Sequence, residues 1–192
     1  MDTLAGFVAW LLMIFLQTCP ANRLRAGEHF YFDLLPQNRR LVVIVTGNDV
    51  KHQVLTFECG MLPESGKELE RTHLATMSWG KQKTVTSFKT ETREELISKP
   101  LVLPDTRTKL LLGTDANYAF LPVKRPSKAT PTKSVEGYTG KIGFAPASYS
   151  LDKDDIDIST DAELGLLNLT FTNAGETCGL QLVKIVLPPK RN

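Results

Sequence analysis

Four aromatic side chains stand where a sugar-binding surface would present them. Trp79, Tyr118, Tyr138 and Tyr149 lie beside glycine or in turn-rich stretches. Exposed aromatic rings stack on sugar rings, while nearby Asp and Asn side chains accept hydrogen bonds from hydroxyl groups. These four residues are therefore the candidate ligand-binding residues, with Trp79 expected to be the most exposed. The alternative for each of them is that the ring fills the core.

A second candidate site is an acidic cluster. Five aspartates fall within ten residues: Asp152, Asp154, Asp155, Asp157 and Asp161. Closely spaced carboxylates can supply the six or more oxygen ligands that calcium takes. The first four are therefore a weak calcium candidate, although the EF-hand loop pattern fails because it lacks the central Gly and the final Glu. The alternative is a solvated acidic loop, and no other cofactor is expected.

Catalytic motifs are lacking in the sequence. The three histidines, His29, His52 and His73, show no metal-ligand spacing, and no Gly-x-Ser-x-Gly elbow occurs. Residues 60–67 superficially resemble a phosphate loop, but the spacing between the glycines is wrong. We therefore predict no catalytic residues and favour binding over catalysis, while a site assembled from distant residues stays open.

The N-terminal segment predicts export. Residues 7–16 are ten apolar residues in a row, which is the length of a signal-peptide core and too short for a membrane span. Small residues at the following positions predict cleavage after Ala21. Two features point instead to an uncleaved anchor: Asp2 is the only charge before the apolar run, and Arg23 and Arg25 follow it closely. A buried N-terminal helix is the third alternative.

Cleavage would also change the cysteine count. It removes Cys19 and leaves Cys59 and Cys178. An even pair in an oxidising compartment predicts one disulfide, and closing a loop of this length would stabilise the fold by roughly 4–5 kcal/mol. The alternative is two buried thiols.

Asn168 begins an N-glycosylation sequon, Asn168-Leu169-Thr170. The alternation of this stretch turns Leu167 and Leu169 inward and Asn168 outward, where a glycan needs it. We therefore predict that Asn168 is glycosylated if the chain enters a eukaryotic secretory pathway. The alternative is an ordinary polar strand residue.

Length and composition fit one folded domain at residues 22–192 behind the signal peptide at residues 1–21. The chain has 192 residues, 42% hydrophobic and 23% charged, with a net charge of +2. This near-neutral balance argues against nucleic acid as a partner. Residues 124–136 are rich in Pro, Ser, Thr and Lys and predict a basic surface loop. A flexible loop kept soluble by its lysines is favoured over one that attracts a sulfated glycan or an anionic lipid surface. The cations of this loop are Lys124, Arg125, Lys128 and Lys133.

Two-residue periodicity dominates the rest of the chain and predicts about ten short strands. The clearest are a hairpin over residues 40–59 with a turn at 47–49, and two closing strands at 164–172 and 179–187. Further strands are expected at 29–34, 69–77, 83–90, 109–112, 118–123, 137–144 and 148–158, with one helical turn at 92–98. This pattern predicts an all-β fold, an antiparallel β-sandwich of jelly-roll type.

The closing pattern of residues 164–187 resembles the end of jelly-roll carbohydrate-binding modules and covers about an eighth of the chain. The resemblance implies a glycan ligand. We therefore expect a secreted binding module for a glycan or an extracellular or cell-surface protein, with no membrane span after cleavage. The alternatives are a structural coat or matrix component, whose edge strands would pair with neighbours, and a secreted hydrolase with a non-local site.

Overall fold

The computed structural model describes residues 23–36, 39–62, 66, 69–79, 85–90, 94–96, 123–124, 130–151, 154–173 and 175–189. Within these ranges the chain forms eleven strands and no helix. None of the described residues belongs to a helix of the length and apolarity that crossing a membrane requires. The strands are β1 (His29–Leu35), β2 (Arg39–Asp49), β3 (Val54–Leu62), β4 (Glu70–Trp79), β5 (Val85–Thr90), β6 (Glu94–Leu96), β7 (Val123–Lys124), β8 (Ala145–Leu151), β9 (Asp154–Asp161), β10 (Gly165–Asn173) and β11 (Glu176–Val186).

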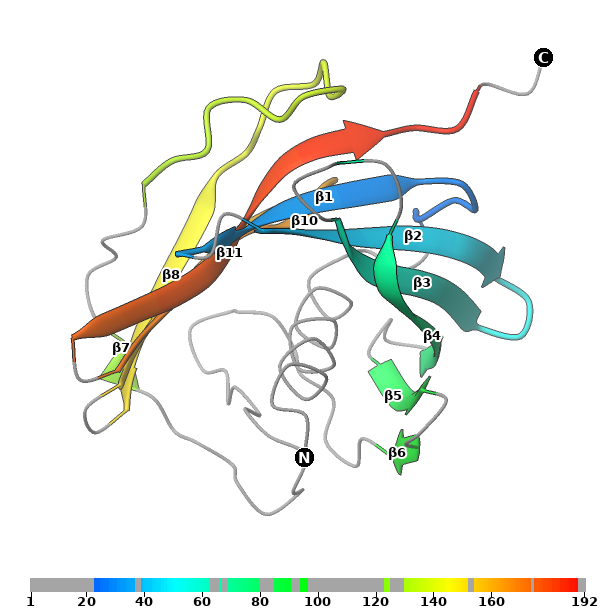
Figure 1. Cartoon of the computed structure of the whole chain (residues 1–192), viewed down its shortest axis with the longest axis horizontal. Helices are drawn as coiled ribbons and strands as arrows, with labels where there is room; N and C mark the ends of the chain where they lie inside the picture. Colours follow the sequence, from blue (N-terminus) through cyan, green and yellow to red (C-terminus); the bar gives the residue numbers. More distant parts are fainter. Residues whose placement is uncertain are drawn as a thin grey trace.

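All of these strands belong to one antiparallel sheet, in the order β6-β5-β4-β3-β2-β1-β11-β10-β9-β8-β7. Strands β1 to β6 and β7 to β11 pair with their neighbours in sequence, and the two groups join at the centre, where the first strand, β1, pairs with the last, β11. Strands β6 and β7 are consecutive in sequence but lie at opposite edges of the sheet. The sheet is open and bent, with β4 to β6 on one side and β7 and β8 on the other (Figure 1). The chain segments before β1 and after β11 therefore meet at the middle of the sheet.

The prediction of an all-β, antiparallel fold is confirmed, whereas the prediction of a jelly-roll sandwich is not. The described strands form one layer, so the structure does not confirm a sandwich of two facing sheets. Antiparallel strands joined by tight turns fit the short turn-rich repeats of the sequence.

Alternation decides which side chains are buried. In β1, Phe30, Phe32 and Leu34 are buried, whereas the residues between them are half-buried. Central strand β2 breaks the alternation, because Val42 is buried as well as Val43. This agrees with the prediction that its apolar run forms a central strand, since β2 lies between β1 and β3.

The strand register places most of the buried side chains on one face of the sheet, which we call the apolar face. Residues opposite one another across antiparallel strands share a face, and this relation runs from β3 through β2, β1, β11, β10 and β9 to β8. The apolar face comprises Phe30, Phe32, Leu34, Leu41, Val43, Val45, Leu55, Phe57, Cys59, Met61, Ala147, Ile156, Ile158, Leu167, Leu169, Leu180, Leu182 and Ile185. The opposite, polar face carries residues such as Tyr31, Asp33, Arg40, Glu58 and Lys184.

Several local predictions were wrong. The predicted helical turn is strand β6 at residues 94–96, because pairing with β5 outweighs the local capping pattern. The predicted strand at 148–158 is two strands, β8 and β9, paired as a hairpin. The predicted strand at 137–144 is irregular chain, and the first hairpin turns at residues 50–53 rather than 47–49.

The predicted basic loop divides in the structure. Lys124 lies in β7, and residues 125–129 are outside the described residues. Residues 130–135 form no strand, as expected of a loop, but Thr132 and Val135 are buried. This end of the segment is therefore packed against the sheet.

Candidate functional site

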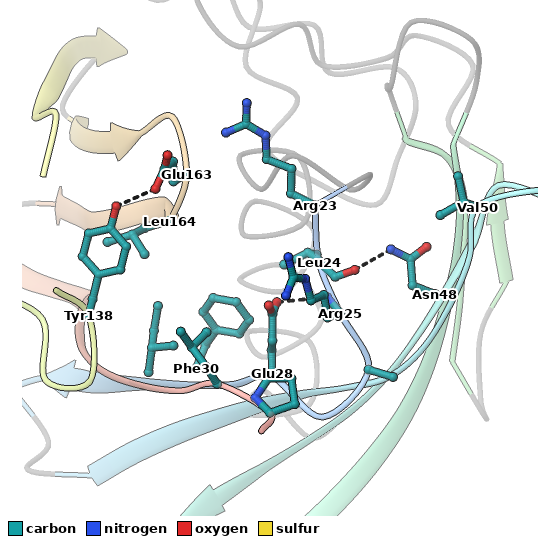
Figure 2. A pocket seen from close by; sticks show the side chains of 14 residues that line it. Arg23, Leu24, Arg25, Glu28, Phe30, Asn48, Val50, Tyr138, Glu163 and Leu164 are labelled. Carbon is teal, nitrogen blue, oxygen red and sulfur yellow. Dashed lines mark hydrogen bonds between the residues drawn. The ribbon is translucent and has the colours of Figure 1, made fainter. Parts of the chain in front are cut away.

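A pocket of about 770 Å³ lies where the chain enters β1 and leaves β11. Its floor is apolar and includes Leu24, Phe30, Leu164 and Ile185. Polar side chains surround the floor: Arg23, Arg25, Glu28, Asn48, Tyr138 and Glu163. Figure 2 shows Tyr138 and Glu163 on one side of the pocket, Leu24 and Asn48 on the other, and Glu28 and Phe30 between them.

Tyr138 is held at the pocket by the chain before it. The backbone N–H of Glu136 donates to the carbonyl of Val183 at 2.9 Å, and the carbonyl of Glu136 accepts from Ile185 N–H at 2.8 Å. Gly137 follows with a positive φ of 83°. A Cβ at Gly137 would lie 2.0 Å from the carbonyl oxygen of Ile185, so only glycine fits there. The sharp turn at this glycine directs Tyr138 into the pocket.

The phenol of Tyr138 is bound to a carboxylate. Its hydroxyl donates to Glu163 Oε2 at 2.7 Å. This hydrogen bond, with smaller contributions from burial and from the negative charges of Glu163 and Asp161, raises the pKa of Tyr138 to about 12. Tyr138 therefore stays a neutral hydrogen-bond donor at physiological pH.

A second carboxylate, Asp161, fixes the turn that carries Glu163. Asp161 is buried, and its Oδ1 accepts the backbone N–H groups of Glu163 at 2.7 Å and Leu164 at 2.8 Å. Its Oδ2 accepts from Gly143 N–H at 2.6 Å. Backbone N–H groups thus satisfy this buried charge, and it positions the turn between β9 and β10 at the pocket wall.

Glu28 places a buried carboxyl group at the pocket. The residue is only 8% exposed, and its Oε2 accepts from the backbone N–H of Arg25 at 3.0 Å. Burial raises the pKa of Glu28, and the hydrogen bond and positive charge of Arg25 offset part of that increase. Its protonated form is therefore more accessible than that of an exposed glutamate.

The wall opposite Tyr138 joins the incoming chain to the end of β2. Asn48 Nδ2 donates to the carbonyl of Leu24 at 2.5 Å, and Leu24 is 5% exposed within the core. At the rim, Val50 and Leu187 are 60% and 54% exposed. The pocket thus has an apolar floor, a mixed polar wall and an apolar rim.

The structure places one of the four predicted aromatic residues at this pocket, namely Tyr138. Trp79 ends β4 and Tyr149 lies in β8, with six strands between β4 and β8 in the sheet order. Tyr118 lies outside the described residues. Ligand binding by Trp79, Tyr118 and Tyr149 therefore stays a prediction.

The calcium candidate is not supported. Asp155 and Asp157 share one face of β9, because successive strand residues alternate, and the side chain of Asp154 is outside the described ones. Asp157 accepts a hydrogen bond from Ser148 Oγ. No group of three or more potential metal ligands occurs among the described residues, and Asp152 lies outside them. The stretch predicted as a solvated loop is mostly strand, which separates its carboxylates.

Asn168 points away from the apolar face, as the alternation predicted, but it is half-buried. Its Nδ2, the atom to which a glycan would be attached, donates to Thr132 Oγ1 at 2.8 Å. Glycosylation of Asn168 stays a prediction, and it would require this contact to break.

The structure does not join Cys59 to Cys178. Cys59 lies opposite Val43, which lies opposite Phe30, which in turn lies opposite Ile185 of β11. Ile185 is seven residues from Cys178, or about 23 Å along a strand, whereas a disulfide needs Cα atoms within about 7 Å. The predicted disulfide is therefore unsupported, because both cysteines lie in one extended sheet.

Most of the pocket residues were missed from the sequence. Arg25, Glu28, Asn48 and Glu163 form no motif, since they lie on segments far apart in the chain. The pairing of the first strand with the last brings these segments together. Only the pairing of β1 with β11 would have indicated this pocket, and no local sequence pattern predicts a contact between such distant strands.

Comparison with known proteins adds no relative: no family model, curated protein or solved structure matches the chain.

Proposed function

We propose that the protein is a binding module that recognises a glycan at this pocket. The observation that carries the proposal is the position of Tyr138, whose ring borders an apolar floor and whose hydroxyl is bound to Glu163. An aromatic ring beside carboxylate, amide and guanidinium groups suits a sugar, which has apolar ring faces and hydroxyl groups at its edges.

Each polar group of the wall has a role in this proposal. Glu163 binds Tyr138 through Oε2, and its other oxygen remains to accept a hydroxyl. Arg23 and Arg25 are exposed donors at the pocket, while Glu28 supplies a buried acceptor. The ring of Tyr138, which is partly exposed, would lie against a sugar face.

Binding to a glycan array tests the proposal, with Tyr138→Ala compared against Tyr31→Ala. Tyr31 is an aromatic residue of β1 on the polar face, outside the pocket. We expect the wild type and Tyr31→Ala to bind the same glycan, and Tyr138→Ala to bind it about tenfold more weakly through loss of stacking. Equal binding by all three proteins, or binding to no glycan, would reject this site.

An extracellular protein is the second ligand class, and the exposed rim favours it. Val50 and Leu187 are exposed aliphatic residues that line the pocket together with Arg23 and Arg25. A pull-down with Val50→Asp alongside the wild type separates the two ligands. Loss of a captured cell-surface protein with unchanged glycan binding would favour the protein.

A hydrolase is the second candidate function, because the pocket contains two glutamates in different environments. Burial raises the pKa of Glu28, as an acid catalyst requires, while Glu163 accepts from Tyr138. Incubation with a glycan panel tests this candidate. Cleavage by the wild type that is abolished in Glu28→Gln would replace binding with catalysis.

The remaining sequence predictions stand beside this proposal. Secretion after cleavage at Ala21 and a jelly-roll-like second sheet stay predictions, and pocket binding depends on neither. A coat or matrix role would use the outer sides of β6 and β7, which no described strand pairs with. A chain that stays monomeric in size-exclusion chromatography at high concentration would reject that role.

A further inference from the structure

The apolar face of the sheet is buried over most of its described length. The side chains named above for this face are at most 7% exposed, whereas Ala145 at its end is exposed and Cys178 is half-buried. Phe32, Phe57, Ile156, Leu167 and Leu169 are among the largest fully buried side chains. This face is therefore the core of the protein rather than a surface.

A single sheet buries its own face only if it closes on itself, and the described edge strands β6 and β7 do not pair with each other. Neighbouring strands are about 4.8 Å apart and their side chains stand away from the sheet, so an uncovered face meets water. The described residues contain neither a helix nor a second sheet to cover it. Only irregular chain does so in part: Leu24 and Val135 belong to the same core cluster, and Tyr138, Ile142 and Phe144 pack against it. We infer that another part of the chain supplies the rest of the cover.

We propose that the apolar N-terminal run, residues 7–16, is this cover and remains part of the folded protein. These ten residues are uninterrupted by any polar side chain. Segments that are apolar all round occur either inside a membrane or inside a protein core. As a helix they would extend about 15 Å, which is too short for a bilayer but enough to cross three strands.

The position where the described chain begins supports this occupant. Leu24 belongs to the core cluster with the apolar face, and its carbonyl is fixed by Asn48. From residue 16 to Leu24 the chain can extend at most about 29 Å. The apolar run is therefore tethered beside the face that needs a cover.

The other long segment outside the described residues fits less well. Residues 97–122 contain Lys99, Asp105, Arg107, Lys109 and Asp115, whereas residues 3–22 contain no charged residue. Burying a charge without a partner is costly. The N-terminal run matches an apolar face better.

This inference and cleavage after Ala21 exclude one another. The proposed cover and the pocket share Phe30 and Ile185, which belong to the apolar face and also line the pocket. The two proposals are therefore tested by different measurements: glycan binding at Tyr138, and burial of residues 7–16.

The first test compares the full chain with residues 22–192, both produced without export. We expect the shorter chain to have a lower Tm and to bind a hydrophobic dye, and a synthetic peptide of residues 3–22 to reverse both effects. A shorter chain that is as stable as the full chain and binds no dye would overturn the proposal.

The second test uses the full chain, so it tests the cover by residues 7–16 even if the shorter chain does not fold. Trp10 lies within the apolar run, so a Trp79→Phe variant leaves it as the single tryptophan. We expect Trp10 to have a blue-shifted emission that acrylamide barely quenches, with unfolding in denaturant restoring both properties to those of an exposed ring. Emission and quenching typical of an exposed tryptophan in the folded chain would refute the cover.

Discussion

The two faces of the sheet have the same backbone and opposite side chains. One is an unbroken layer of aliphatic and aromatic groups, while the other carries ion pairs such as Arg40 with Asp33 and Lys184 with Glu136, each at 2.7 Å. Strand alternation alone separates the two sets, as β1 illustrates. The difference shows that most of the buried apolar surface lies on the apolar face, although Val42, Ser148 and Ser159 are buried on the polar face as well.

The largest effect should come from removing a large side chain from the apolar face. Phe57→Ala deletes a fully buried ring of β3, and we expect the free energy of unfolding to fall by about 3–5 kcal/mol. Gln181→Ala on the exposed polar face is the control and should change it by about 0.5 kcal/mol or less. Urea denaturation measures both, and equal losses would remove the distinction between the faces.

The next largest loss of stability should come from a substitution at Gly137, in the turn before Tyr138. Gly137 and Gly175 both have positive φ, but only at Gly137 would a Cβ collide with backbone. We expect Gly175→Ala to cost about 1–2 kcal/mol for the left-handed conformation, and Gly137→Ala to cost more because β11 must move.

Thermal unfolding of the two glycine variants measures this difference. Gly137→Ala should also lower the pKa of Tyr138 from about 12 toward its usual 10, because the turn that holds its hydroxyl against Glu163 is displaced. The absorbance of the ionised phenol reports that pKa. Identical stabilities for the two variants would show that residues 135–137 do not pack as described.

A smaller effect should appear in the pH dependence of stability. Because burial raises the folded-state pKa of Glu28 above its usual 4.5, its protonation favours folding. That contribution is fully present below pH 4.5 and is lost as the pH rises through the folded-state value. Glu28→Gln cannot titrate, so the stability of the wild type relative to this variant should fall between pH 4 and pH 7. Parallel pH profiles from denaturant titrations would contradict the burial of this carboxyl group.

The smallest effect should come from an ion pair on the polar face. Arg40 and Asp33 are each about two-fifths exposed, so solvent and salt screen their attraction. We expect Arg40→Ala to cost about 0.2–1 kcal/mol, and high salt to remove most of that loss. A loss comparable with that of Phe57→Ala would show that the two faces are equally important.

The sequence predicts the strands whose alternation is clean, and it fails where local and long-range signals differ. β1, β10 and β11 are recognised from alternation or apolar runs. The hairpin at residues 151–154 has no Gly or Pro to mark it, so β8 and β9 were predicted as one strand. A capping pattern at Thr92 and Glu95 predicted a helical turn where strand pairing with β5 prevails.

The pocket was less predictable than the strands. Tyr138 was recognised as a candidate aromatic residue, but its partner Glu163 and the buried Glu28 are 25 and 110 residues away in sequence. Their proximity depends on β1 pairing with β11, which is a contact between opposite ends of the described chain. Local propensity contains no information about such a contact.

Hydrogen exchange of residues 7–16 in the folded full-length protein tests most directly whether the apolar face is a core closed by the N-terminal run. We predict that the amides of these residues are protected to the same degree as those of β1 and become unprotected together with them in denaturant. Exchange at the rate of an unfolded peptide, while β1 stays protected, would contradict the account.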